Sequence, residues 1–286
     1  MLIRAFCAAL LTFGAVDLPA QEVPYFVTYS HHMEEPGSLE IEAKSATGTP
    51  MGGNRFGAGA LELEYGTRAW WTSELYLEGQ STAKDSTVYT GYRIENRIRP
   101  LMREHWINPV LYFEFEDING ANKSLLEVVG HDGNDDLTGA NADARAEKKH
   151  EGELKLILSS NAKGWNFSEN FIAEKNLGHA PWEFGYALAA SRPLRLEGGA
   201  RSSAFALQNF AAGAEMYGGL GDTDVLSLHE TSHYFGPAID WNMPRGWRIT
   251  ASPNFGLNGH SVDHIYRFGL AYEIGQMGRF FSRGGR

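Results

Sequence analysis

The feature that most constrains this chain is the alternation of apolar and polar residues at a period of two. It appears in Leu61-Glu62-Leu63-Glu64-Tyr65 and again over residues 111–116, 154–158 and 266–274. Successive side chains of a β-strand point to opposite faces, so this period gives a strand one apolar and one polar face. A chain that repeats the pattern along most of its length has to bury or cover many apolar strand faces.

Twelve segments carry the pattern, each of roughly ten residues, the length a tilted strand needs to cross a bilayer. The connections after the second, sixth and tenth segments are short, and those after the fifth and ninth are long. Short turns at one end and longer loops at the other are typical of transmembrane barrels. We therefore predict an all-β fold, a closed antiparallel transmembrane β-barrel of about twelve strands. The segments are 37–46, 54–65, 68–79, 86–99, 108–117, 147–160, 163–174, 181–191, 206–218, 230–241, 245–256 and 263–274.

The first 20 residues have the composition of a secretory signal peptide. Arg4 precedes an apolar stretch, and Leu18-Pro19-Ala20 forms a cleavage site. We expect a signal peptide over 1–20, a periplasmic N-terminal segment over 21–36, the barrel over 37–274 and a C-terminal tail over 275–286. With secretion and a barrel, the expected location is the outer membrane of a Gram-negative cell.

Charge and cysteine content exclude several classes of protein. The formal net charge of −10 argues against a nucleic-acid partner. The single cysteine, Cys7, lies in the signal peptide, so the mature chain is expected to have neither disulfides nor thiol chemistry. No run reaches the ~20 apolar residues of a membrane helix. Tryptophans collect near the predicted strand ends, where membrane interfaces favour them; they are Trp70, Trp71, Trp165, Trp182, Trp241 and Trp247.

The last predicted strand carries a short motif, in which Arg267, Gly269, Tyr272 and Ile274 fill its polar, glycine, aromatic and apolar places. It resembles the terminal-strand signal of the Gram-negative outer-membrane β-barrel superfamily, although here residues 275–286 follow it. The resemblance implies recognition by the barrel-assembly machinery and contact with outer-membrane lipid and lipopolysaccharide. The overall build is also similar to small porin-like transporters of aromatic-degradation pathways, which implies a role in transport.

If the apolar faces meet lipid, the charged faces line the lumen, where acids outnumber bases. Such a lumen favours cations or polar solutes, so we predict a passive channel or transporter for small polar or cationic solutes. No cofactor is expected, and the solute itself is unknown. The predicted lumen residues are Glu62, Glu64, Glu74, Arg93, Glu95, Arg97, Glu114, Glu116, Glu153, Lys155, Glu183, Glu215, Arg248 and Arg267, with Glu78 and Glu273 beside them.

An alternative uses the same charges differently. Confined charges can pair and fill a closed barrel, which would then act as a structural or interaction protein through its extracellular loops, chiefly loop 118–146. An outer-membrane enzyme or a soluble periplasmic β-protein is less favoured. The cluster His260–His264 holds Ser, Asp and His without a hydrolase motif, so no catalytic residue is assigned. Neither His31–Glu35 nor His131–Asp136 has the spacing of a metal site, so no metal ligand is assigned.

Three residues depart from the alternation. Glu169 shares the parity of lipid-facing aromatics, and a β-bulge or a place near the membrane interface would relieve its cost. Pro237 and Pro253 lie inside predicted strands and cannot donate a ladder hydrogen bond. We expect a bulge or a gap in the sheet at the prolines.

Overall fold

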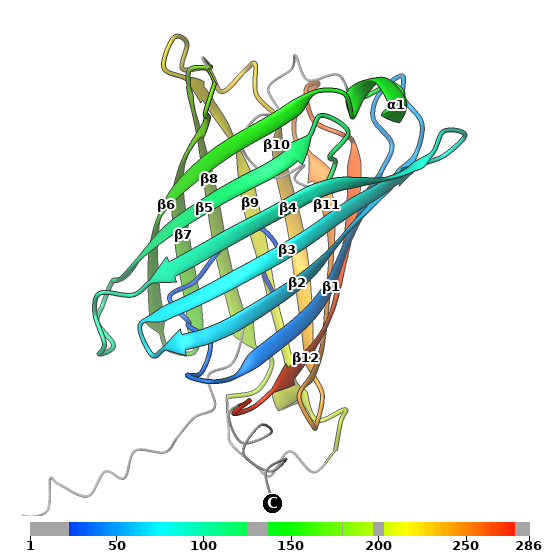
Figure 1. Ribbon diagram of the computed structural model, residues 1–286. Helices are drawn as coiled ribbons and strands as arrows, with labels where there is room; N and C mark the ends of the chain where they lie inside the picture. Colours follow the sequence, from blue (N-terminus) through cyan, green and yellow to red (C-terminus); the bar gives the residue numbers. More distant parts are fainter. Residues whose placement is uncertain (1–22, 125–136, 179, 197–202, 278–286) are drawn as a thin grey trace, which may run out of the picture.

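The computed structural model describes residues 23–124, 137–178, 180–196 and 203–277, in which a closed barrel of antiparallel strands forms (Figure 1). Each strand pairs with its neighbours in sequence, and β1 closes onto β12. The strands are β1 (Leu39–Gly48), β2 (Phe56–Arg68), β3 (Trp71–Thr82), β4 (Thr87–Ile98), β5 (Asn108–Asn119), β6 (Lys148–Ala162), β7 (Trp165–Asn176), β8 (Trp182–Pro193), β9 (Phe210–Asp222), β10 (His233–Asn242), β11 (Trp247–Gly256) and β12 (His264–Ile274).

The predicted fold is confirmed, and every predicted strand lies within four residues of an observed one. Two short helices interrupt the loops: α1 (Asn141–Ala144) and the 3-10 helix η1 (Leu207–Asn209). Among the described residues, no helix is long and apolar enough to cross a membrane. The predicted signal peptide over 1–20 and most of the predicted C-terminal tail lie outside the described residues.

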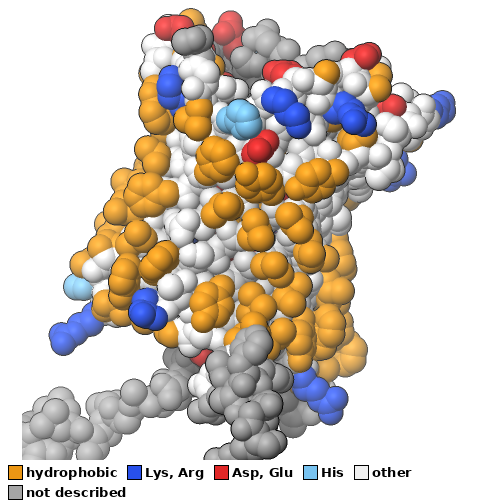
Figure 2. All heavy atoms as spheres, viewed as in Figure 1, with side chains coloured by type: hydrophobic (Ala, Val, Ile, Leu, Met, Phe, Trp, Pro, Cys, Tyr) orange, Lys and Arg blue, Asp and Glu red, His pale blue; other side chains and the backbone are white. Residues whose placement is uncertain are grey.

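The exterior of the barrel carries an apolar belt (Figure 2). Outward side chains such as Leu111, Phe113 and Phe115 are about 40% exposed, whereas their inward neighbours on β5 are buried. Trp71, Trp165, Trp182 and Trp247 are each the first residue of a strand, Trp241 is the second-last residue of β10, and Trp70 precedes β3. The prediction that tryptophans mark strand ends is confirmed, and the apolar belt between the ends matches a bilayer.

The prediction of a gap at the prolines is also confirmed. Strands β10 and β11 pair at Phe235 with Phe255 and resume at Ile239 with Ala251. The registers on both sides place Pro237 opposite Pro253 in the unpaired stretch. Two facing residues that lack an N–H cannot form the ladder hydrogen bonds, which explains the gap.

Glu169 needs no bulge. It pairs in unbroken register with Leu158 on β6 and Leu188 on β8 and faces outward, exposed. It lies four residues from Trp165, the first residue of β7. Of the two explanations for this acid, the second therefore applies. Glu169 lies near the end of its strand, where a charge is tolerated better than at the middle of the bilayer.

The N-terminal segment does not lie outside the barrel. Residues 23–36, which we name the plug, run inside the lumen and then join β1 (Figure 1). Val27, Thr28, Ser30 and His31 of the plug are buried. The assignment of 21–36 to the periplasm is corrected for this part, because the polar inner wall offers the plug's backbone hydrogen-bond partners.

Candidate functional site: the acidic lumen and its plug

The inner wall carries a continuous row of carboxylates, which we name the acid row. Each member is the direct cross-strand partner of the next, over ten neighbouring strands. The row comprises Glu273 on β12, Glu40 on β1, Glu64 on β2, Glu74 on β3, Glu95 on β4, Glu114 on β5, Glu153 on β6, Glu174 on β7, Glu183 on β8 and Asp222 on β9.

The acid row connects the two ends of the barrel. Glu40 is the second residue of β1 and Glu273 the second-last of β12, at the end where the chain enters and leaves the barrel. Asp222 is the last residue of β9, at the opposite end. Strands in a closed barrel tilt, so a row perpendicular to the strands climbs along the barrel axis. The carboxylates therefore ascend the lumen as a spiral.

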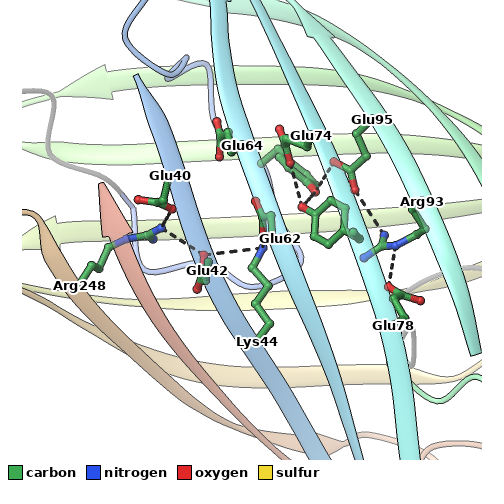
Figure 3. Close-up of polar contacts among 12 residues, drawn as sticks. Glu40, Glu42, Lys44, Glu62, Glu64, Glu74, Glu78, Arg93, Glu95 and Arg248 are labelled. Atoms are coloured by element: carbon green, nitrogen blue, oxygen red, sulfur yellow. Dashed lines mark hydrogen bonds and ion pairs between the residues drawn. The ribbon is translucent and has the colours of Figure 1, made fainter. Parts of the chain in front are cut away.

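Basic side chains neutralise the lower part of the row (Figure 3). Arg248 on β11 pairs with Glu40 and, at 3.2 Å, with Glu42. Lys44 forms an ion pair with Glu62, which lies two residues above Glu64 of the row on β2. These partners come from strands far apart in sequence, so only the closed barrel brings them together.

Two arginines of β4 bridge the middle of the row. Arg97 contacts Glu64 and lies 2.6 Å from Glu74. Arg93 lies 2.8 Å from Glu78 and 3.4 Å from Glu95 (Figure 3). It also lies 3.1 Å from Glu114. Buried charges of this kind have to be paired, since an unpaired charge in a low-dielectric interior is costly.

Acids dominate the upper part of the row. Lys155 pairs with Glu153 at 2.7 Å, and the row then continues through Glu174 and Glu183. Beside it lies Glu116, only 2% exposed, whose Oε2 has no hydrogen-bond partner among the described residues. Along the acid row itself, acids therefore outnumber bases most toward the end of β9.

One grouping of the described residues brings three carboxylates close enough to share a cation. One oxygen from each of Glu62, Glu64 and Glu74 lies within 4.8 Å of the others. Lys44 and Arg97 already contact these carboxylates. The grouping is thus part of the ion-pair network rather than a set of uncompensated acids.

The plug is attached to the wall opposite the ion-pair network. The carboxylate of Glu215 on β9 accepts hydrogen bonds from three successive backbone N–H groups, those of Phe26 at 3.2 Å, Val27 at 3.0 Å and Thr28 at 3.2 Å. Asn170 on β7 accepts the N–H of Tyr29 at 2.6 Å and donates to its carbonyl at 2.9 Å. Bonds from several amides to one carboxylate are charge-assisted and specific in geometry.

Tyr29 connects the plug to the acid row. Its hydroxyl donates to Glu95 at 2.9 Å, and its ring lies 5.2 Å from the Arg97 guanidinium and 4.9 Å from Lys155 Nζ. Burial and the nearby glutamates raise the pKa of Tyr29, so the hydroxyl remains a donor. The plug therefore spans the lumen from β9 to β4.

His31 fixes the other end of the plug. Its Nδ1 lies 2.7 Å from Ser159 Oγ and its Nε2 lies 3.1 Å from Glu104 in the β4–β5 loop. Burial, with Arg99 nearby, lowers the pKa of His31 from 6.5 to about 4. The docked imidazole is consequently neutral at neutral pH.

A cavity of about 410 Å³ separates the plug from the strands that carry the lower acid row. Farther into the lumen, the space beside Lys44, Tyr76, Arg93 and Arg267 shrinks to about 30 Å³. A space of that size holds about one water molecule. Of these two cavities among the described residues, the larger therefore lies at the end near the termini and the smaller lies farther in.

Loop 118–146 also reaches into the barrel. Asn122 donates to Glu78, Asn141 accepts from Gln80 at 2.6 Å, and buried Lys123 lies over the Phe56 ring. The expectation that this loop forms a contact surface is corrected for these residues, because their polar groups are used inside the lumen. Residues 125–136 lie outside the described part.

The predicted lumen residues face inward as expected from strand parity, and most are buried; Glu64, Glu183, Arg248 and Glu273 are partly exposed. Arg267 does not join the acid row: it lies over the Tyr217 ring at 5.8 Å. The sequence did not single out Glu40, Glu174 and Asp222, nor the register that aligns the row. The alternation Glu40-Ile41-Glu42 could have identified Glu40 from the sequence.

Two further sequence motifs have structural explanations. A Cβ on Gly269 would lie 2.2 Å from Glu42 and 3.5 Å from the Phe26 ring, so the glycine leaves room for the lumen contents. Tyr272 faces outward and packs on Trp247 at 4.8 Å. Ser261 Oγ donates to the carbonyl of His233 at 2.8 Å rather than to an imidazole, so this cluster lacks the geometry of a triad.

A closed barrel with an apolar exterior and a polar lumen is the fold of Gram-negative outer-membrane β-barrels. No protein-family model matches the chain, and no curated protein matches it. Among solved structures, the KdgM porin superposes with a TM-score of 0.50 at 8% identity, covering 82% of this chain and 98% of that one. The COG4313 outer membrane channel from Pseudomonas putida F1 gives 0.53 at 10% identity, covering 88% and 99%. KdgM has also been solved in complex with disordered oligogalacturonate. These likenesses establish the fold.

Proposed function

We propose that this protein is a passive outer-membrane channel for small cationic or polar solutes. The observation that carries the proposal is the acid row, which supplies carboxylates in unbroken register from one end of the lumen to the other. A pore lined by acids lowers the energy of a cation and raises that of an anion. Successive sites of moderate strength allow a cation to enter and also to leave.

The charge of the lumen argues against the ligand seen with KdgM. An oligogalacturonate is an acidic oligosaccharide, and acids outnumber bases along the row. Glu174 and Glu183 would repel such a ligand near the wider loops. The two proteins share a fold. Because acids face the lumen of this chain, we infer that it prefers solutes whose charge is opposite to that of an oligogalacturonate.

In this proposal the plug is the gate. It occupies the lumen between Glu215 and Glu95, and the cavity beside Phe26, Tyr29 and Arg93 holds about one water. Conduction therefore requires the plug to leave its site or to shift within it. The closed structural barrel remains the second candidate, favoured by the ion pairs of Arg93 and Arg97.

Other partners follow from the fold and the resemblance. The outward apolar belt contacts outer-membrane lipid. We infer that β12, with Arg267, Gly269, Tyr272 and Ile274, is the strand read by the barrel-assembly machinery. Replacing Tyr272 by Ala would test this role, by comparing the yield of assembled barrel in cells with its yield on refolding in detergent.

The test of function is ion conductance of the purified mature chain in a planar bilayer under a salt gradient. The expected result is cation-selective current that increases when the plug is removed. A barrel that is folded by heat-modifiable mobility but never conducts, with or without its plug, would favour the closed structural barrel. Anion selectivity would contradict the role given to the acid row.

A further inference from the structure

A groove opens on the outside of the barrel, at the end opposite the termini. It occupies about 580 Å³ between the first residues of β4 and the segment that joins α1 to β6. Pairing of β4 with β5 begins at Gly91, so residues 87–90 have a strand partner only on the β3 side. The left-handed φ of +151° at Gly91 and the register shift there turn this part of β4 away from β5.

The groove is basic on an otherwise acidic protein. Arg145 and Lys148 line it, and both are exposed. Neither makes an ion pair with another described residue. Asp117, the acid in the lining, lies 3.8 Å from His150 Nδ1. The groove therefore offers two positive charges to an outside ligand.

Other lining groups complete a polar site. Thr90 is 1% exposed, and its Oγ1 has no hydrogen-bond partner among the described residues. Tyr89 is 63% exposed. An unsatisfied buried hydroxyl is costly unless a ligand or water engages it. The groove thus contains a hydroxyl donor, two cations and an aromatic face. Among the described residues, no side chain of the protein occupies this site as a ligand.

The position of the groove identifies its occupant. It adjoins outward Tyr92, at the upper edge of the apolar belt, and Figure 2 shows Lys and Arg side chains just above that edge. A molecule in the groove is therefore continuous with the lipid-facing surface below it. Basic and aromatic side chains at this depth match the headgroup region of a membrane.

We propose that this groove binds the phosphorylated headgroup of a glycolipid in the outer leaflet. Arg145 and Lys148 pair with the phosphate, the Thr90 hydroxyl donates a hydrogen bond to it, and the acyl chains lie along the apolar belt. Charge-assisted bonds from two cations to one phosphate give both affinity and a defined position. The site is separate from the lumen and does not depend on conduction.

The test is lipid binding to the full mature chain in detergent, measured by native mass spectrometry. The probes are bisphosphorylated lipid A, the same lipid with both phosphates removed, and inorganic phosphate as a competitor. The variant is Arg145→Gln with Lys148→Gln. The matched control is Arg68→Gln with Lys163→Gln, two exposed basic residues at the opposite end of the barrel.

The expected result is about a tenfold loss of affinity for bisphosphorylated lipid A in the groove variant, the size of one strong charge-assisted contact. The control should bind as the unsubstituted chain does, and the dephosphorylated lipid should bind all three proteins equally weakly. Equal loss in both variants, or equal binding of both lipids, would overturn the site. Full competition by inorganic phosphate at the lipid's own concentration would overturn the assignment to a lipid. Heat-modifiable mobility confirms that each variant is folded.

Discussion

The two halves of the lumen wall differ in chemistry. Strands β1–β6 carry nearly all of the buried ion pairs, including those of Lys44, Arg93, Arg97 and Lys155. Strands β7–β12 present many small, neutral or apolar side chains there, together with Glu215, Asp240, Arg248 and Arg267 and with four members of the acid row, Glu174, Glu183, Asp222 and Glu273. The hydrogen bonds of the plug up to Thr28 go to the second half, and those of Tyr29 and of residues after it also reach the first.

The difference shows how one interior can be both polar and packed. Val27 of the plug joins an apolar cluster with Ile172, Ala187, Tyr217 and Tyr234. Burying a valine side chain contributes roughly 1.5–3 kcal/mol of stability. Contact with this apolar cluster therefore stabilises the docked plug. The charged wall offers a smaller apolar cluster, in which Tyr29 and Met33 of the plug pack against Val110, Tyr112 and Ile157. There the plug also meets the acid row, because the Tyr29 hydroxyl donates to Glu95.

Removing the plug should have the largest effect on this contrast. A chain lacking residues 23–34 keeps every strand but loses the contacts to Glu215, Asn170 and Glu95. We expect conductance to rise on the order of tenfold or more, since the closed state loses its stabilising segment. Planar-bilayer recordings measure this. Unchanged conductance in a folded barrel would mean that the plug does not gate the lumen.

Glu215→Gln should have the next largest effect. The carboxylate accepts three backbone N–H bonds, and a neutral amide oxygen accepts them more weakly. A loss of about 1.5–3 kcal/mol in plug docking would raise the population of released plug by at least tenfold. Hydrogen exchange of the Phe26–Thr28 amides measures the release.

The matched control for Glu215→Gln is Glu169→Gln, which removes a charge from the exposed outer face of β7. It should leave the exchange of the plug amides unchanged. Faster exchange in both variants would attribute the effect to the overall charge of the barrel rather than to the docking carboxylate.

Much of the barrel was predictable from the sequence, whereas the lumen contents were not. The period of two gives each strand's faces directly, so inward Glu95 and outward Leu111 follow without a structure. The register between strands does not follow from the period alone, and so the acid row was not foreseen. The plug was missed for another reason: Tyr25 to Glu34 show no strand period, and their contacts with the barrel wall are distant in sequence.

Ion selectivity should respond more modestly to the upper acid row. We expect Glu174→Gln with Glu183→Gln, in the chain lacking the plug, to reduce the preference for cations severalfold, because the charges lie where acids outnumber bases. Reversal potentials under a salt gradient measure the permeability ratio. Glu230→Gln with Asp224→Asn, in the exposed β9–β10 loop, is the control of equal charge. A larger change in the control would place the selective charges in the loop.

The smallest expected effect is a dependence of the plug on pH through His31. Docked, the imidazole has a pKa of about 4, whereas the released plug has the ordinary 6.5. The released state therefore binds the proton first, and docking weakens as pH falls from 6.5 toward 4, with no further change from this group below that range. Conductance should rise over that interval, and the rise should be smaller in His31→Asn.

His229→Asn, in an exposed loop, should keep the full rise. Glu104, Arg99, His32 and the acid row are common to both variants, so their own titration cancels in the comparison. Identical pH profiles in the two variants would show that His31 does not control the release of the plug.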